Sequence, residues 1–560
     1  MLSLLVIIPL LAAALIAMPF VSRTRVVSVA FLGTLLPFVP LVMLASRFDW
    51  TNGGVDQFTS KSAWLPDLGL QVLLGVDSIS FLLIALTVLL GPICIAASLT
   101  AVTKRVKTYY FWLLVLQAAM CGVFMARDVI LFYVFFEFTL IPMFVLISLY
   151  GSTNRRKAAI KFFLYTFTGS VIALAGLVYV AWFNATQLTA GQVVSGGQWT
   201  FEVAALRAAS QQMPAHTQAW VFAALMLGFS IKVPLFPLHT WLPLAHTEAP
   251  TAGSVMLAGV LLKLGTYGIL VFAIPFCPLA AVAYSVFIAT LSIIGIVAAG
   301  LICWVQTDVK KLVAYSSVAH LGFCVLGMFA FNAAGMQGAI LYMINHGLST
   351  GGLFLLIGMV YERYHTRSMK ELGGLAARMP VWSTFMVFFA MASVGLPGLN
   401  GFVSEFLCLL GTFQAGPNWA AGAPGSIAGT VGTLGPIYAA IAGTGMIIAA
   451  IYLLYMVGKV CFGPLVEPHH HHDAEHDAPA LPPDLSAREI TLLLPLAALC
   501  LLLGVYPKIA TDALEPAVSG RVRLVIDAPG SPLQPPLTRA PKTAAEPAAA
   551  PASSAPSESK

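Results

Sequence analysis

Apolar stretches of about 20 residues recur along the whole chain, separated by short polar segments. A helix needs about 20 apolar residues to cross the hydrocarbon core of a bilayer. The pattern therefore predicts an all-α polytopic membrane protein. About fourteen transmembrane helices are expected, near 2–21, 27–46, 77–100, 109–126, 128–150, 159–184, 218–244, 251–275, 278–303, 310–330, 335–361, 382–412, 431–460 and 488–506.

The order of these stretches predicts two related halves. Pro234 and Pro237 interrupt the seventh stretch, and a glycine-rich segment with Pro397 interrupts the twelfth. Broken helices at membrane depth occur only against protein or a hydrated cavity. Two five-helix repeats of opposite orientation, each with one broken helix, place a transport site at the repeat interface. The expected segments are 1–108 with helices 1–3, 109–275 as the first repeat, 278–460 as the second, 461–487 as a His-rich cytoplasmic loop, 488–506 as the last helix, and 507–560 as a largely disordered tail.

Composition supports a membrane protein and excludes a water-soluble one. Hydrophobic residues make up 59% of the 560 and charged residues only 9%, against roughly a quarter charged in soluble domains. Mean hydropathy is +0.88. The net charge of +6 does not indicate nucleic-acid binding, because the basic residues lie in short loops.

Basic residues gather in alternate loops and predict the orientation. One side carries 17 Lys and Arg: Arg23, Arg25, Lys104, Arg105, Lys107, Arg155, Arg156, Lys157, Lys161, Lys310, Lys311, Arg363, Arg367, Lys370, Arg378, Lys459 and Arg488. The opposite side carries four, Arg47, Lys61, Arg127 and Arg207. The positive-inside rule puts the first set in the cytoplasm and both termini on the outer face.

No cofactor or metal site is predicted. The eight cysteines are scattered without C-x-x-C spacing, and neither a G-x-G-x-x-G motif nor a P-loop occurs. The stretch His469–His472 with its acidic neighbours has two interpretations, an incidental metal-binding segment or a solvated flexible loop.

Four charged residues lie deep inside the predicted helices, away from the helix ends: Glu137, Lys232, Lys263 and Glu405. A charge at the bilayer centre costs about 2.5–3.5 kcal/mol on insertion scales, so such residues usually have a function. Four histidines share these helices: His239, His246, His320 and His346. The set suits a proton relay, since a lysine removed from water changes its protonation readily and a nearby carboxylate holds it charged.

Most of these residues are predicted to lie at a similar depth in the membrane. Glu137 lies about nine residues, or roughly 14 Å, from the outer end of its helix. By the same count Lys263, His320 and His346 lie near the midplane, and Glu405 lies nearer the outer face. These groups describe a line in the plane of the membrane.

Structural interpretations remain open for several of these residues. Lys232 and Glu137 are also consistent with a purely structural salt bridge, and His239 and His246 with packing roles. Glu405 is also consistent with a hydrogen bond to the backbone freed near Pro397.

Several long motifs resemble the antiporter-like subunits of respiratory complex I over about residues 75–460. They are Phe135-Phe-Glu137, the segment from Lys232-Val-Pro to Ala249-Pro-Thr251, Lys263-Leu-Gly, and the segment from Gln306-Thr-Asp to His320. Two features distinguish this chain from sister subunits of the family that it resembles. Glu405 stands where two of those subunits carry a lysine, and no long lateral helix follows the last predicted span.

The resemblance implies a proton path through Glu137, Lys232, Lys263, His320 and Glu405. It also implies a bacterial inner membrane location, sister antiporter-like subunits on both flanks, and quinone reduction in other subunits. Rival functions are a subunit of a multi-chain Na⁺/H⁺ antiporter and the membrane arm of a hydrogenase. A structural scaffold is a third alternative, but it does not require four buried charges.

Overall fold

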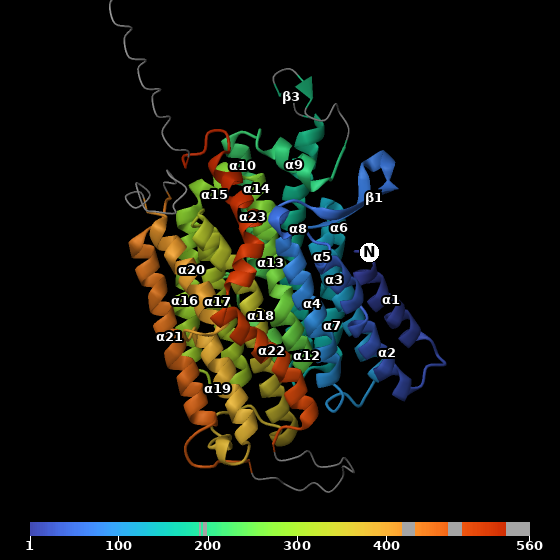
Figure 1. Cartoon of the computed structure of the whole chain (residues 1–560), viewed down its shortest axis with the longest axis vertical. Helices are drawn as coiled ribbons and strands as arrows, with labels where there is room; N and C mark the ends of the chain where they lie inside the picture. The colour runs from blue at the N-terminus through green and yellow to red at the C-terminus, as the bar shows by residue number, and fades with distance from the viewer. Residues whose placement is uncertain (187, 190–191, 194–198, 417–431, 469–483, 534–560) are drawn as a thin grey trace, which may run out of the picture.

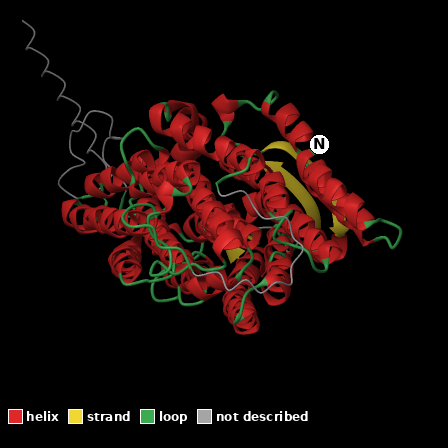
Figure 2. Ribbon diagram, turned by 90° about the horizontal axis from the view of Figure 1, so that it is seen from below, coloured by secondary structure: helices red, strands yellow, loops and turns green. Residues whose placement is uncertain are grey.

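The computed structural model describes residues 1–186, 188–189, 192–193, 199–416, 432–468 and 484–533. The chain is a helical bundle with two short β-hairpins (Figures 1 and 2). Its first part comprises α1 (Leu4–Ala17), α2 (Arg23–Leu35), α3 (Phe38–Ala45), η1 (Trp50–Asn52), β1 (Gln57–Leu65), η2 (Pro66–Leu68), β2 (Leu70–Val76), α4 (Ser78–Ala97), α5 (Val106–Met125), α6 (Val129–Phe138), α7 (Leu140–Tyr150), α8 (Arg155–Thr186), β3 (Leu188–Thr189), β4 (Gln192–Val193) and α9 (Val203–Ser210).

The middle part contains both helix breaks. It comprises α10 (Ala215–Lys232), α11 (Leu242–Glu248), α12 (Thr251–Met256), the π-helix η3 (Leu257–Leu261), α13 (Leu262–Gly268), the π-helix η4 (Ile269–Ala273), α14 (Ile274–Phe276), α15 (Pro278–Ala283), α16 (Ser285–Trp304), α17 (Val309–Met328), α18 (Ala333–Tyr364), η5 (Leu375–Ala377), α19 (Pro380–Val394) and α20 (Asn400–Gln414). The last part comprises α21 (Pro436–Val460), α22 (Ala487–Val505) and α23 (Lys508–Ile526).

Eleven helices in the described part of the chain are long and apolar enough to cross a membrane. Two more apolar helices, α1 and α19, are shorter. The all-α membrane class is therefore confirmed, while the count of fourteen spans stays a prediction. The two ends of the bundle have different loops. Strands β1 and β2 pair at one end, here called the hairpin face. The start of α8, the end of α18 and the start of α22 lie at the other end (Figure 1), here called the basic face because these helix ends carry Arg155, Arg363 and Arg488.

Two long segments form the centre of the bundle. The apolar windows of Thr251–Phe276 and of α18 are completely buried by surrounding helices, whereas only a third of the windows of α21 and α22 is buried. Helix α18 packs against α17, α20 and α12, so it contacts helices of both predicted repeats. Polar side chains on these two central segments are therefore shielded from lipid.

Both helix breaks predicted from proline and glycine coincide with interruptions in the structure. Helix α10 ends at Lys232, and residues 233–241 lead to α11. The Trp241 Nε1 group donates a hydrogen bond to the Ile231 carbonyl across this break, 2.9 Å away. At the second break α19 ends at Val394 and α20 begins at Asn400, with Gly395 in the left-handed conformation at a φ of +82°.

Asparagine side chains fasten the second break to α18. The Asn345 amide nitrogen donates to the Asn400 carbonyl at 2.8 Å, and the Asn400 amide nitrogen donates to the Asn345 carbonyl at 3.1 Å. The broken backbone thus has partners inside the bundle, as a non-helical segment at this depth requires.

The chain after Tyr506 differs from the predicted tail. Residues 508–526 form α23, a helix with one apolar side that is buried at Leu514, Val518 and Val522. The prediction of a disordered tail was based on the composition of residues 507–560 as a whole. The Pro/Ala/Ser bias comes mainly from the residues after 526, so it does not apply to the amphipathic pattern of α23. The rest of the predicted tail, 534–560, and most of the His-rich loop, 469–483, lie outside the described residues.

Ion pairs hold α23 to the bundle at the hairpin face. Arg521 donates to the Asp77 carboxylate at 2.9 Å, and both side chains are buried. Asp77 also lies 3.7 Å from Arg127, which pairs with Asp56 at 2.5 Å. Helix α23, the start of α4 and the segment before β1 therefore share one buried charge network.

We expect the substitution Arg521→Gln to destabilise the protein, because it leaves one of the Asp77 carboxylate oxygens without its charged partner. Removing one member of a buried pair typically costs about 3–5 kcal/mol. Thermal unfolding in detergent measures the loss as a lower midpoint. Arg523→Gln is the matched control, since Arg523 is exposed on the same helix; equal midpoints for the two variants would contradict the prediction.

Candidate functional site

Lys263 lies at the centre of the bundle, in the short helix between the two π-helices. Its side chain is fully buried. The Nζ atom lies 2.7 Å from Nδ1 of His346 on α18, and it also donates a hydrogen bond to the Ala258 carbonyl in η3. A π-helix widens the turn and frees backbone carbonyls for other partners, which is why such turns often occur at functional sites.

A second group of side chains continues from His346 toward α20. The rings of His346 and His320 lie 5.8 Å apart between centroids. His320 Nδ1 bonds to the Tyr342 hydroxyl, which in turn donates to the Glu405 carboxylate, and His320 Nδ1 lies 3.4 Å from Glu405 Oε1. Lys263, His346, His320, Tyr342 and Glu405 thus form one series of neighbouring polar groups, here called the central series.

Glu405 occupies the space beside the second helix break. A Cβ atom built on Gly395 would lie 2.5 Å from Glu405 Oε2. Only glycine fits at this position, both for its positive φ and for this close approach. The break therefore provides the room in which the carboxylate reaches His320 and Tyr342.

Lys232 and Glu137 lie apart from the central series. Lys232 is the last residue of α10 and is 2% exposed, and its Nζ atom lies 4.5 Å from the Phe136 ring centroid. Glu137 on α6 is half-buried and interacts electrostatically with Lys232. The two side chains form no ion pair within 4.0 Å, so the structure does not show the salt bridge that a purely structural role predicts.

The end of α10 nevertheless packs closely on the helix that carries Lys263. A Cβ atom built on Gly265 would lie 3.0 Å from the Cβ atom of Lys232. Glycine at position 265 lets the two lysine-bearing helices approach each other. The first break thereby places Lys232 next to the start of the central series.

Several buried polar atoms of these residues have no protein partner among the described residues: Lys232 Nζ, His320 Nε2, His346 Nε2 and Glu405 Oε2. Buried polar atoms are normally hydrogen-bonded to protein or to ordered water. These atoms are therefore the places where we expect internal water to join the side chains.

Tyr342 is the member of the central series that the sequence analysis missed. It lies four residues before His346 on α18, and residues at this spacing share a helix face. The four-residue spacing from His346 is therefore the sequence feature that could have identified Tyr342. The two histidines with open roles lie outside the central series: His239 stacks on Phe236 and His246 stacks on Phe354, with ring centroids 5.5 and 4.7 Å apart.

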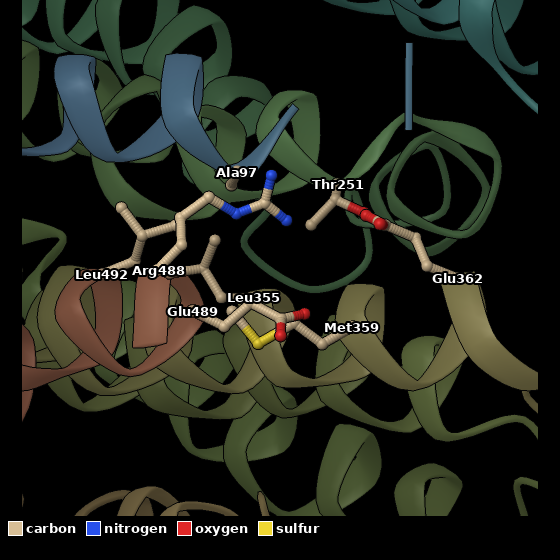
Figure 3. A pocket seen from close by; sticks show the side chains of 8 residues that line it. All are labelled: Ala97, Thr251, Leu355, Met359, Glu362, Arg488, Glu489 and Leu492. Atoms are coloured by element: carbon tan, nitrogen blue, oxygen red, sulfur yellow. The ribbon is translucent and has the colours of Figure 1, made fainter. Parts of the chain in front are cut away.

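A crevice of about 240 Å³ opens at the basic face where α4, α12, α18 and α22 meet. Figure 3 shows Glu362 and Thr251 on one side of the crevice and Arg488 with Leu492 on the other, the Arg488 guanidinium near Ala97. Thr100 joins the two sides, because its hydroxyl donates to Glu362 at 2.6 Å and accepts from Arg488 at 3.2 Å. Glu362 is 16 residues beyond His346, or roughly 24 Å along the helix, so the crevice is separate from the central series. No group of three or more potential metal ligands occurs among the described residues.

Comparison with known proteins identifies relatives of the whole chain. A family described as NADH:quinone oxidoreductase/Mrp antiporter, TM, matches residues 126–434. NADH-quinone oxidoreductase subunit M of Rhodobacter capsulatus is 41% identical over 93% of this chain and 96% of its own length. A chain of respiratory complex I from Thermus thermophilus with bound NADH superposes with a TM-score of 0.78 at 28% identity, covering 94% of this chain and all of its own. A chain of the Mrp complex from Dietzia has the same fold, with a TM-score of 0.74 at 23% identity over 94% of this chain and 52% of its own.

Proposed function

The chain belongs to the NADH:quinone oxidoreductase/Mrp antiporter family of membrane subunits, and we propose that its central series and the Lys232–Glu137 pair form the proton path. The chain corresponds to subunit M, a proton-pumping subunit of the membrane arm of complex I. The sequence prediction of this family and function is confirmed. The 41% identity to subunit M favours this function over an Mrp-type antiporter, whose matched chain is only 23% identical.

The proposed proton path is based on the series of contacts from Lys263 to Glu405. Each neighbour in it can bind and release a proton: histidine at its two ring nitrogens, lysine at its amine, tyrosine at its hydroxyl and glutamate at its carboxylate. Such groups in a membrane interior usually mark a proton relay. Four different helices, α13, α17, α18 and α20, contribute the residues, so small helix displacements alter the contacts between them.

The proposed sequence of events begins at the Lys232–Glu137 pair. Glu137 stabilises the charged form of Lys232 as long as its own charge stays near. A change in the position or protonation of Glu137 then releases the Lys232 proton toward Lys263. From Lys263 the proton moves by way of His346, His320 and Tyr342 to Glu405.

The chain works together with other subunits and in a membrane with a defined orientation. The chain carries no redox motif, and we assign NADH oxidation and quinone reduction to other subunits of the complex. Sister antiporter-like subunits and lipid surround it in a bacterial inner membrane. The loop charges favour an orientation with the basic face in the cytoplasm and the hairpin face outside.

Neutral substitutions at the first pair should stop pumping. We expect Glu137→Gln and Lys232→Ala to lower proton translocation at least tenfold while the complex still assembles, because each removes one of the two interacting charges. The measurement is ΔpH formation by vesicles with equal amounts of assembled complex. Normal translocation in either assembled variant would contradict the proposed path.

Glu405 distinguishes a relay from a structural role. Glu405→Asp should retain much of the pumping, because a protonatable group remains, whereas Glu405→Gln should stop it. A residue that only hydrogen-bonds the broken backbone predicts the reverse order, since glutamine keeps the length and polarity of glutamate. The same ΔpH assay, with assembly verified, decides which order holds.

The orientation can be tested by labelling single cysteines with an impermeant thiol reagent. All eight native cysteines are buried, which keeps the background low. We expect Asn154→Cys at the basic face to react from the cytoplasmic side and Thr59→Cys in β1 from the outer side. Reaction of each from the opposite side would show that the topology is inverted.

A further inference from the structure

Lys310 differs from the loop cation that its position in the sequence predicts. It lies in the first turn of α17 and is only 7% exposed. Its Nζ atom donates a hydrogen bond to the Ala249 carbonyl at 2.5 Å and forms no ion pair within 4.0 Å among the described residues. The neighbouring Lys311 is exposed, as expected of a loop cation. Lys310 is therefore a buried amine near the basic face without a direct counter-ion.

The charged groups nearest Lys310 have other partners. Asp308 pairs with Arg367 at 3.4 Å, and Arg367 also donates to the Thr247 carbonyl. The Glu248 carboxylate accepts hydrogen bonds from the Ser152 hydroxyl at 2.7 Å and from the Asn154 backbone at 2.8 Å. Neither acid is in direct contact with Lys310. Burial without a counter-ion disfavours the charged form of a lysine, so such a lysine can act as a proton donor and acceptor.

His246 lies between Lys310 and the central series. Its ring is fully buried, and neither ring nitrogen has a partner among the described residues. It interacts electrostatically with Lys310 on one side and with Lys263 and His346 on the other. A histidine with two free ring nitrogens can accept a proton on one nitrogen and release one from the other.

We propose that Lys310 and His246 form the entry through which protons from the basic face reach Lys263, and that the Lys232–Glu137 pair then starts their transfer along the central series. This inference rests on the function proposed above. A neutral Lys310 takes a proton from water at the basic face and passes it to one nitrogen of His246, with water joining the two groups. The other nitrogen of His246 releases its proton toward Lys263 and His346. A single proton moves at each step, and Lys310 returns to its neutral form. His246 ends with its proton on the other ring nitrogen, and rotation of the ring or exchange of the proton through water restores its starting tautomer.

The alternative role of Lys310 is structural. Ala249 follows the last residue of α11, and a cation beside the final carbonyls stabilises a helix C-terminus. Arginine preserves the charge and the hydrogen-bond donors that this role needs, but it does not release its proton in proteins. Histidine is protonatable but is shorter and reaches the Ala249 carbonyl less well.

The experiment compares Lys310→Arg, Lys310→His and Lys311→Arg in the complete complex. With assembly verified by the amount of this chain in the purified complex, we expect Lys310→Arg to lower ΔpH formation at least tenfold. Lys310→His should keep more pumping than Lys310→Arg, and the matched control Lys311→Arg should equal wild type. Pumping near wild type in Lys310→Arg, or an equal loss in the Arg and His variants, would overturn the inference.

Two further variants separate this inference from the proposed function. His246→Phe keeps a ring against Phe354 but has no nitrogen, and it should lose pumping to the same extent as Lys310→Arg. Normal pumping in His246→Phe would overturn the entry through His246. Lys263→Ala tests the central series itself: if it pumps normally, the proposed function fails, whereas loss in Lys263→Ala with normal pumping in Lys310→Arg rejects the entry alone.

Discussion

The free-energy cost of placing ionisable groups in the middle of a membrane governs this structure. Each such group costs a few kcal/mol when it faces lipid, so the helices that carry Lys263 and His346 are completely enclosed by others. Enclosure in turn demands close helix packing, and glycines such as Gly265 allow it. The arrangement of the bundle thus follows from the need to keep a few polar side chains away from lipid while they stay close to one another.

The two halves of the chain use their broken helices differently. In the first half, the break ends a helix at Lys232 and leaves the lysine close to an aromatic ring, without a hydrogen-bond partner among the described residues. In the second half, the break makes room for Glu405 within a hydrogen-bonded group. The first arrangement leaves a charge whose state responds to its surroundings, and the second holds a proton acceptor in a fixed place. A proton path from the first break to the second therefore runs from Lys232, whose charge depends on its surroundings, to Glu405, which hydrogen bonds hold in one position.

Much of this organisation could be predicted from the sequence, because membrane burial imposes strong patterns. Apolar stretches of fixed length gave the class of fold, and charges within them gave Glu137, Lys232, Lys263 and Glu405. Tyr342 could not be found in this way, because a tyrosine in an apolar helix carries no charge and is common as a packing residue. The burial of Lys310 was missed for a related reason: a lysine at the end of a predicted helix gives the same sequence pattern whether its side chain faces water or is buried. Helix α23 was missed because its amphipathic pattern adjoins a segment of disorder-prone composition.

The contact between Gly395 and Glu405 has a consequence for genetics. Glycine 395 has no chemistry of its own, yet any side chain there would collide with the carboxylate and would also disfavour the backbone conformation of the break. A random mutagenesis screen for defective energy conservation should consequently recover position 395 as often as the acid itself. Second-site suppressors of substitutions at 395 would be substitutions at 405 that shorten or redirect its side chain. The two positions would therefore be genetically coupled.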